Sequence, residues 1–90
     1  MSETTRKKLQ AHCAKIEGQI KGISNMIAED RSCVDLIIQI SAASSSLTSL
    51  AKKIMAHHVE HCVVEGIKRG EDTETVNQLK LAFDQFSKLK

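Results

Sequence analysis

A single amphipathic pattern occupies more than a third of this 90-residue chain and sets the scale of any fold that it can adopt. From Cys33 onward nothing interrupts the pattern before Gly70, and apolar side chains recur at intervals of four and three, at Leu36, Ile40, Ala43, Leu47, Leu50 and Ile54. This spacing predicts one α-helix over residues 33–69. Such a helix is about 55 Å long, more than the width of a domain that a chain of this length can build. A single copy would leave apolar surface bare, so the sequence predicts an oligomer.

The segment before this long helix carries an apolar stripe of the same kind. The stripe consists of Leu9, Cys13, Ile16, Ile20, Ile23 and Ile27. It predicts a helix over residues 4–28, with Cys13 as a core residue. Gly18 and Gly22 lie inside this helix, where we expect them to permit close contact with another helix.

Signals for helix ends divide the chain into three helices. Ser32 is a suitable N-cap for the long helix, with Asp35 three residues later, and Gly70 is a suitable stop. A short third helix is predicted over residues 73–88. The chain contains no proline and only two aromatic residues, which also favours helices. We therefore expect an all-α protomer of three helices, forming a single domain over residues 1–90.

Charge and cysteine content narrow the possible classes of function. The 13 Lys and Arg residues against 11 Asp and Glu residues give a mildly basic chain, which permits nucleic-acid binding without requiring it. Three cysteines fit a disulfide framework poorly and fit metal, redox or core roles better. No signal peptide and no run of 18 or more apolar residues is apparent. We expect a soluble cytoplasmic protein without a membrane partner.

The stretch HHVEHC, residues 57–62, contains three of the four histidines. His58 and Cys62 are four residues apart, so on a helix they share a face and can bind one ion together. His57 and His61 form a second such pair on a neighbouring face. At about 100° per residue, Cys33 falls on the same strip of the long helix as His58 and Cys62.

Cys33 and Cys62 are 29 residues apart, which is about 43 Å along a straight helix, so they cannot bind one ion within a single chain. They can meet in an antiparallel dimer whose two-fold axis lies near Leu47, because position 33 of one helix then lies opposite about position 60 of the other. The small-residue run SAASSS, residues 41–46, would lie beside this axis. The sequence predicts two identical metal sites, each with Cys33 from one protomer and His58 and Cys62 from the other.

Two thiolates and one imidazole form a soft ligand set that suits Cu(I). Zn(II) would require a fourth ligand, for which His61 or Glu60 is the nearest candidate. Otherwise we expect His57 and His61 to face solvent or to support the site. No set of residues resembles a nucleophile, a base and an oxyanion donor, so an enzyme is not expected.

Three stretches of the chain resemble the copper-sensing operon repressor family (CsoR/RcnR). They are KIEGQIKGI at 15–23, CVDLIIQISAA at 33–43 and HVEHC at 58–62. The resemblance covers nearly the whole chain. It implies all-helical dimers that assemble into disc-shaped tetramers, bind operator DNA and release it when a ligand binds.

The resemblance also implies roles for individual residues. Cys33, His58 and Cys62 stand where copper sensors carry their ligands. Ser32 and Gln78 stand where such sensors often have a Tyr and a Glu, and they are candidates for supporting the site. The N-terminal MSETTRKK lacks the histidine of nickel and cobalt sensors.

Basic residues on the first two helices are the candidates for DNA contacts. They are Arg6, Lys8, His12, Lys15 and Lys21 on the first helix and Lys52 and Lys53 on the second. Lys8, His12 and Lys15 fall on one face, which would contact phosphates once multiplied in a tetramer. At His12 and Ser44 relatives commonly have basic residues. Without an aromatic residue on this face, phosphate contacts and DNA shape are expected to provide recognition.

Two other functions compete with a Cu(I)-released repressor. The first is a repressor that senses persulfide or other thiol chemistry, with Cys33 and Cys62 as a dithiol switch and no metal. The second is a metal-binding helical protein that does not bind DNA.

Overall fold

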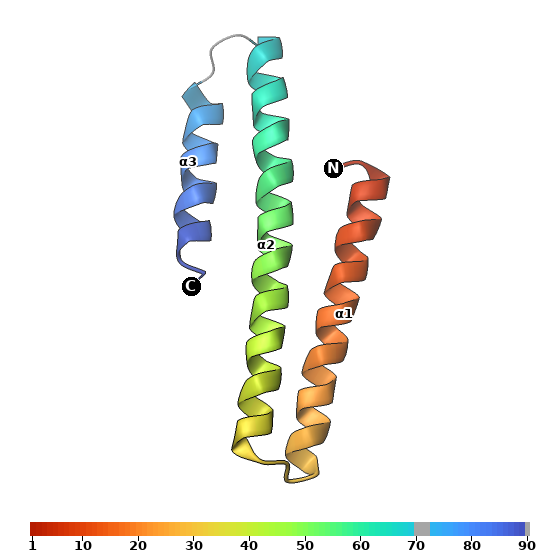
Figure 1. Ribbon diagram of the computed structural model, residues 1–90. Coiled ribbons are helices and arrows are strands. Elements are labelled where there is room, and N and C mark those ends of the chain that lie inside the picture. Colours follow the sequence, from red (N-terminus) through yellow and green to blue (C-terminus); the bar gives the residue numbers. More distant parts are fainter. Residues whose placement is uncertain (70–72, 90) are drawn as a thin grey trace. The chain divides into compact units, whose positions relative to one another are not determined.

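Three α-helices account for nearly all of the chain in the computed structural model, which describes the backbone of residues 1–69 and 73–89. It describes the side chains of these residues as well, apart from residues 62, 63, 65–69, 73 and 75. The helices are α1 (Glu3–Ala28), α2 (Cys33–Arg69) and α3 (Thr73–Ser87), and the described residues contain no strand (Figure 1). The predicted all-α, three-helix protomer is confirmed. The predicted stop of the long helix at Gly70 lies outside the described residues.

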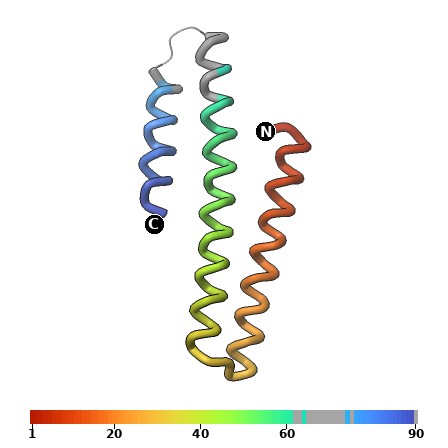
Figure 2. The backbone as a smooth tube through the Cα atoms, in the orientation of Figure 1, coloured from red at the N-terminus to blue at the C-terminus, as the bar shows by residue number. Residues whose placement is uncertain are grey.

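The chain divides into two compact units, an N-terminal unit of Met1–Leu50 and a C-terminal unit of Ala51–Lys90. In the N-terminal unit, α1 runs antiparallel beside the first part of α2 (Figures 1 and 2). In the C-terminal unit, α3 lies beside the last part of α2 (Figure 1). That the whole chain acts as a single domain stays a prediction.

Polar side chains cap the first two helices at their N-termini. The Ser2 hydroxyl accepts a hydrogen bond from the Thr5 backbone N–H at 3.1 Å, and the Ser32 hydroxyl accepts one from the Asp35 N–H, also at 3.1 Å. Each bond satisfies a backbone donor that has no partner inside its helix. The predicted cap at Ser32 is confirmed, and it fixes the start of α2 at Cys33.

The turn between α1 and α2 reverses the chain through a residue with a left-handed backbone. Asp30 has a φ of 57°. Its backbone N–H donates to the Ile27 carbonyl, and the next N–H, that of Arg31, donates to the Met26 carbonyl, both at 3.0 Å. This pair of bonds is the Schellman arrangement, which usually has glycine at the left-handed position. The turn is therefore well bonded but carries a side chain where glycine is preferred.

The core of the N-terminal unit is small. Only Ile16 and Ala43 are buried among the described residues, with 7% and 3% of their surface exposed. Ala43 belongs to the SAASSS run and is buried where α1 lies beside α2 (Figure 1). The predicted position of this run beside a dimer axis stays a prediction. Little else is buried, so most apolar side chains of the unit remain available to another molecule.

Two expectations for α1 are not met within the protomer. Cys13 is exposed, so its assignment to the core is wrong. The apolar stripe of α1 is wider than the face that α2 covers, and it leaves Cys13, Ile20 and Ile27 on the open side. At Gly18 and Gly22 no atom of another element lies within 4 Å of the position that a Cβ would take, so no close helix contact forms there within the chain.

Candidate metal centre

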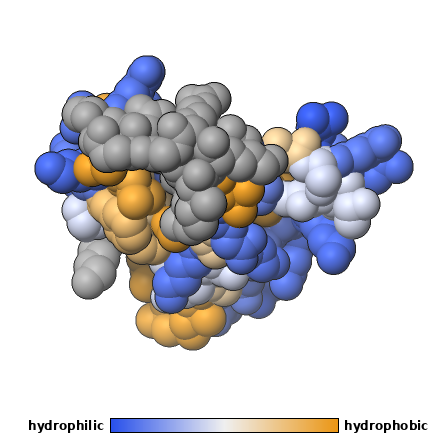
Figure 3. Space-filling view, turned by 90° about the horizontal axis from the view of Figure 1, so that it is seen from above, coloured by the Kyte–Doolittle hydropathy of each residue, from blue (hydrophilic) through white to orange (hydrophobic). Residues whose placement is uncertain are grey.

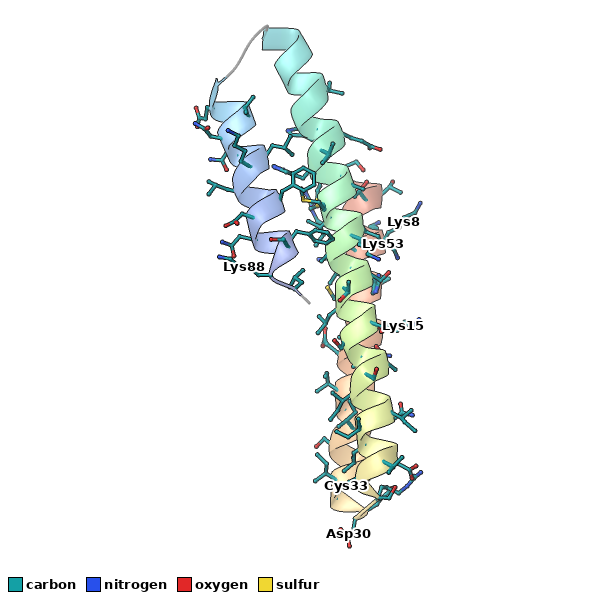
Figure 4. All side chains as sticks on the ribbon, turned by 60° about the vertical axis from the view of Figure 1, so that its left-hand side comes forward. Lys8, Lys15, Asp30, Cys33, Lys53 and Lys88 are labelled. Atoms are coloured by element: carbon teal, nitrogen blue, oxygen red, sulfur yellow. The ribbon has the colours of Figure 1, made fainter. Side chains whose placement is uncertain are left out.

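Cys33 is the first residue of α2 and carries an exposed, free thiol. It lies beside the turn that joins α1 to α2 (Figure 4). The Ser32 cap and the Schellman turn determine where α2 begins and so fix the position of this cysteine. Its exposure means that the thiol is accessible to a metal ion, an oxidant or a second protomer.

His58 and Cys62 lie one helical turn apart in the last part of α2. The His58 side chain is half-buried, and the Cys62 side chain lies outside the described residues. Within the part of the protomer that the structure describes, no three His, Cys, Asp or Glu side chains gather closely enough to hold a metal ion.

His57 and His61 lie on the neighbouring face of α2. Their ring centroids are 6.3 Å apart and their planes differ by 19°. His57 is half-buried and His61 is exposed. The two imidazoles thus leave the helix side by side in similar orientations.

The two residues suggested as supports for the site have different surroundings. The Ser32 hydroxyl is used in the cap of α2, where it accepts the Asp35 N–H. Gln78 is exposed on α3. Their support of a metal ligand stays a prediction.

Most candidate DNA-binding residues are exposed. On α1, Lys8 and Lys15 extend to the same side of the helix (Figure 4). Among the described residues of α1, Lys7 pairs with Glu3 at 3.6 Å, and no ion pair is formed by Lys8 or Lys15. The remaining exposed basic candidates are Arg6, Lys21, Lys52 and Lys53. The exposed lysines of α1 are thus positioned to meet an anionic surface.

His12 differs from the other candidates because it is half-buried and its Nε2 lies 3.1 Å from the Ser46 carbonyl oxygen of α2. Helical spacing groups His12 with Lys8 and Lys15 and does not predict this contact with α2. The helical position of His12 could have predicted the contact, because His12 lies about 40° around the helix from Ile16, at the border of the apolar stripe that faces α2. Gln19 lies at the same border of the apolar stripe. Its side-chain oxygen is buried and has no hydrogen-bond partner among the described residues.

Apolar side chains are exposed in patches on the molecular surface (Figure 3). Among the side chains of α2 that the structure describes, the exposed large apolar ones are Val34, Ile37, Ile38, Ile40, Leu47, Ile54 and Val64. By length and composition alone, Cys33–His61 could cross a membrane. A helix at the centre of a soluble oligomer meets the same criterion, because its apolar face is covered only in the assembly.

Comparison with known proteins defines the class to which this arrangement belongs. The chain matches the family model described as metal-sensitive transcriptional repressor over residues 5–85. It is 39% identical to the copper-sensing transcriptional repressor CsoR of Bacillus subtilis over 74 residues, which are 82% of this chain and 73% of that protein. The chain therefore belongs to the metal-sensitive transcriptional repressor family, whose members are repressors and not enzymes.

Two solved structures have the same fold. The copper-sensing repressor CsoR with Cu(I) from Geobacillus thermodenitrificans superposes with a TM-score of 0.87 at 27% identity, covering 98% of this chain and 92% of that one. The nickel-responsive transcriptional regulator InrS gives a TM-score of 0.84 at 31% identity, covering 89% and 90%. Fold similarity is thus shared by a copper-sensing and a nickel-responsive protein, and it does not by itself select the metal.

Proposed function

We propose that the chain is a cytoplasmic Cu(I)-responsive repressor that binds operator DNA without metal and is released when Cu(I) binds between protomers. Cys33 of one protomer and His58 and Cys62 of the other would hold the ion. The proposal adds an inducer, a ligand set and an assembly to the family membership established above.

The uninterrupted length of α2 is the observation that carries this proposal. Cys33 is its first residue, and His58 follows 25 residues later in the same helix, about 37 Å away at the rise of an α-helix. Metal–ligand bonds are roughly 2.0–2.3 Å long, so Cys33 and His58 of one helix cannot hold the same ion. Two α2 helices paired antiparallel about Leu47 would place Cys33 of each near His58 and Cys62 of the other.

An exposed apolar strip on α2 supports this pairing. Ile37, Ile40, Leu47 and Ile54 are exposed, and all four fall within about 60° of Cys33 around the helix. The strip that would bring the ligands together is thus the one that a single protomer leaves uncovered. We infer a homodimer that buries this strip, and a homotetramer formed by two such dimers.

The donor set favours Cu(I) over the alternatives. Two thiolates and one imidazole give a soft three-coordinate site, whereas Zn(II) usually takes four ligands. The similarity to copper-sensing relatives supports the same choice. Because a structural relative is nickel-responsive, Ni(II) is the metal whose effect on DNA binding must be compared with that of Cu(I).

DNA release follows from linkage between two equilibria. The exposed face of Lys8 and Lys15, repeated in each protomer, would contact phosphates in the metal-free assembly. If Cys33, His58 and Cys62 bind Cu(I) more tightly in an arrangement that fits DNA poorly, metal and DNA weaken each other by the same factor. A coupling free energy of about 3 kcal/mol lowers DNA affinity roughly 150-fold.

The exposed thiol of Cys33 keeps persulfide sensing as the second candidate, because a dithiol switch needs an accessible cysteine. Fluorescence anisotropy with labelled DNA from upstream of the gene distinguishes the candidates. We expect tight binding by the reduced, metal-free protein and release by stoichiometric Cu(I), but not by Ni(II) or persulfide. Release by persulfide alone would favour the thiol sensor, and absence of DNA binding would favour a metal-binding protein of another kind.

A further inference from the structure

We propose that His57 and His61 form a second metal site on α2, separate from Cys33, His58 and Cys62, which binds a divalent ion such as Ni(II) or Zn(II). The two residues are four apart in one helix, so their side chains lie one above the other on one face. Imidazole is a suitable ligand for both ions. The proposal does not depend on DNA binding or on Cu(I).

The observed ring geometry is within reach of a shared ion. The ring centroids are 6.3 Å apart. With metal–nitrogen bonds of about 2.0–2.1 Å, two imidazoles at neighbouring positions of a tetrahedral or octahedral ion have centroids about 4.5–5.5 Å apart, so the rings must approach by about 1 Å or more. Rotation about the side-chain bonds of His57 and His61 would bring the rings closer, and the ring planes, which differ by only 19°, are already nearly parallel.

The site is directed away from the predicted Cu(I) ligands. His58 and Cys62 each lie one residue after His57 and His61 in α2. The pair of His58 and Cys62 is therefore rotated by about 100° around the helix axis from the pair of His57 and His61. One ion therefore cannot be held by both pairs without a break in the helix. His61 would belong to the histidine pair and would not serve as a fourth ligand for the thiolate site.

The surroundings of the pair suit a hydrated divalent ion more than Cu(I). His61 is exposed and His57 is half-buried, so water can fill the remaining coordination positions. Glu60 is also exposed and lies about 60° around the helix from His57, where its carboxylate adds favourable charge. The pair contains no thiolate, and nitrogen and oxygen ligands favour Ni(II) and Zn(II) over Cu(I).

Calorimetric titration with Ni(II) of the full chain carrying Cys33→Ser and Cys62→Ser tests the proposal. We expect about one Ni(II) per protomer in this double variant, and at least about ten-fold weaker binding after adding either His57→Gln or His61→Gln. His58→Gln in the same background is the matched control and should leave the affinity unchanged. Loss of binding with His58→Gln, or no binding in the double-serine variant, would overturn the proposal.

A second measurement avoids replacing any histidine. In the double-serine variant, Ni(II) should shift and broaden the NMR signals of the His57 and His61 ring protons before those of His58. Bound metal should also raise the midpoint of thermal unfolding, because an ion bound to two groups of the folded helix stabilises it. Signals of His58 responding first would contradict the assignment.

Discussion

The imidazole Nε2 of His12 lies 3.1 Å from the backbone carbonyl oxygen of Ser46, and this contact joins α1 to the middle of α2. A carbonyl only accepts, so the imidazole N–H is the donor. The residue predicted to contact DNA thus also holds together the two helices of the N-terminal unit. Its neighbours Lys8 and Lys15 remain exposed on the same helix.

Replacing His12 with alanine should destabilise the protein. The change removes the half-buried hydrogen bond to the Ser46 carbonyl, and a bond of this kind contributes about 1 kcal/mol to the free energy of unfolding. Urea denaturation at fixed protein concentration measures the effect. Lys8→Ala, an exposed change one turn away, is the control and should stay within about 0.5 kcal/mol of the original protein. Equal losses in the two variants would show that the bond contributes nothing specific.

Replacing Asp30 with glycine should have the opposite effect on stability. Asp30 has a φ of 57° in the Schellman turn between α1 and α2. Glycine adopts this backbone conformation without the steric cost of a side chain, and we expect a gain of about 0.5–1 kcal/mol. Denaturant unfolding of Asp30→Gly and Asp30→Ala, compared with the original chain, tests this. An alanine variant as stable as the glycine variant would argue against strain at this position.

Removing Lys8 or Lys15 should weaken DNA binding in a way that depends on salt. Each lost phosphate contact reduces the slope of log affinity against log salt concentration by about 0.9. Lys7→Ala is the matched control, because Lys7 is on the same helix but pairs with Glu3. Anisotropy titrations at several salt concentrations give the slopes. If Lys7→Ala changes the slope as much as Lys8→Ala, the proposed face is wrong.

The thiol ligands should be needed for release and not for DNA binding. We expect Cys33→Ala and Cys62→Ala to bind operator DNA with nearly unchanged affinity and to lose the roughly 150-fold weakening caused by Cu(I). Cys13→Ala should respond to Cu(I) like the original chain, because Cys13 lies on α1 outside the ligand set. Copper-dependent release by both of the first two variants would exclude them as ligands.

Helix positions were predictable because they depend on local patterns. Four-and-three spacing of apolar residues and the Ser32 cap lead to an α2 that begins at Cys33, as observed. Cys13 was assigned wrongly because periodicity identifies an apolar stripe but not how much of its width a neighbouring helix covers. Cys13 and Ile20 lie on the part that α2 leaves open.

Contacts between helices were harder to predict from the sequence. The bond between His12 and Ser46 joins residues 34 apart, and its register depends on how α1 docks against Ala43. Spacing alone paired His57 with His61 on one face, but the distance between their rings required side-chain positions. The geometry of the metal centre is harder still to predict from the sequence, because its proposed ligands come from two chains and depend on how the chains pack.

The central claim, that each Cu(I) site is shared between protomers, can be tested with mixed dimers. A Cys33→Ala chain and a Cys62→Ala chain, carrying different affinity tags, are co-expressed and the heterodimer is purified through both tags. The heterodimer keeps one complete set of ligands, consisting of Cys33 from the second chain and His58 and Cys62 from the first. Anaerobic Cu(I) titration with X-ray absorption should show one tightly bound ion per heterodimer, with two sulfur ligands and one nitrogen ligand, and no comparable site in either homodimer. A heterodimer that binds no Cu(I), or a homodimer that binds Cu(I) as tightly as the heterodimer does, would contradict a site built between two chains.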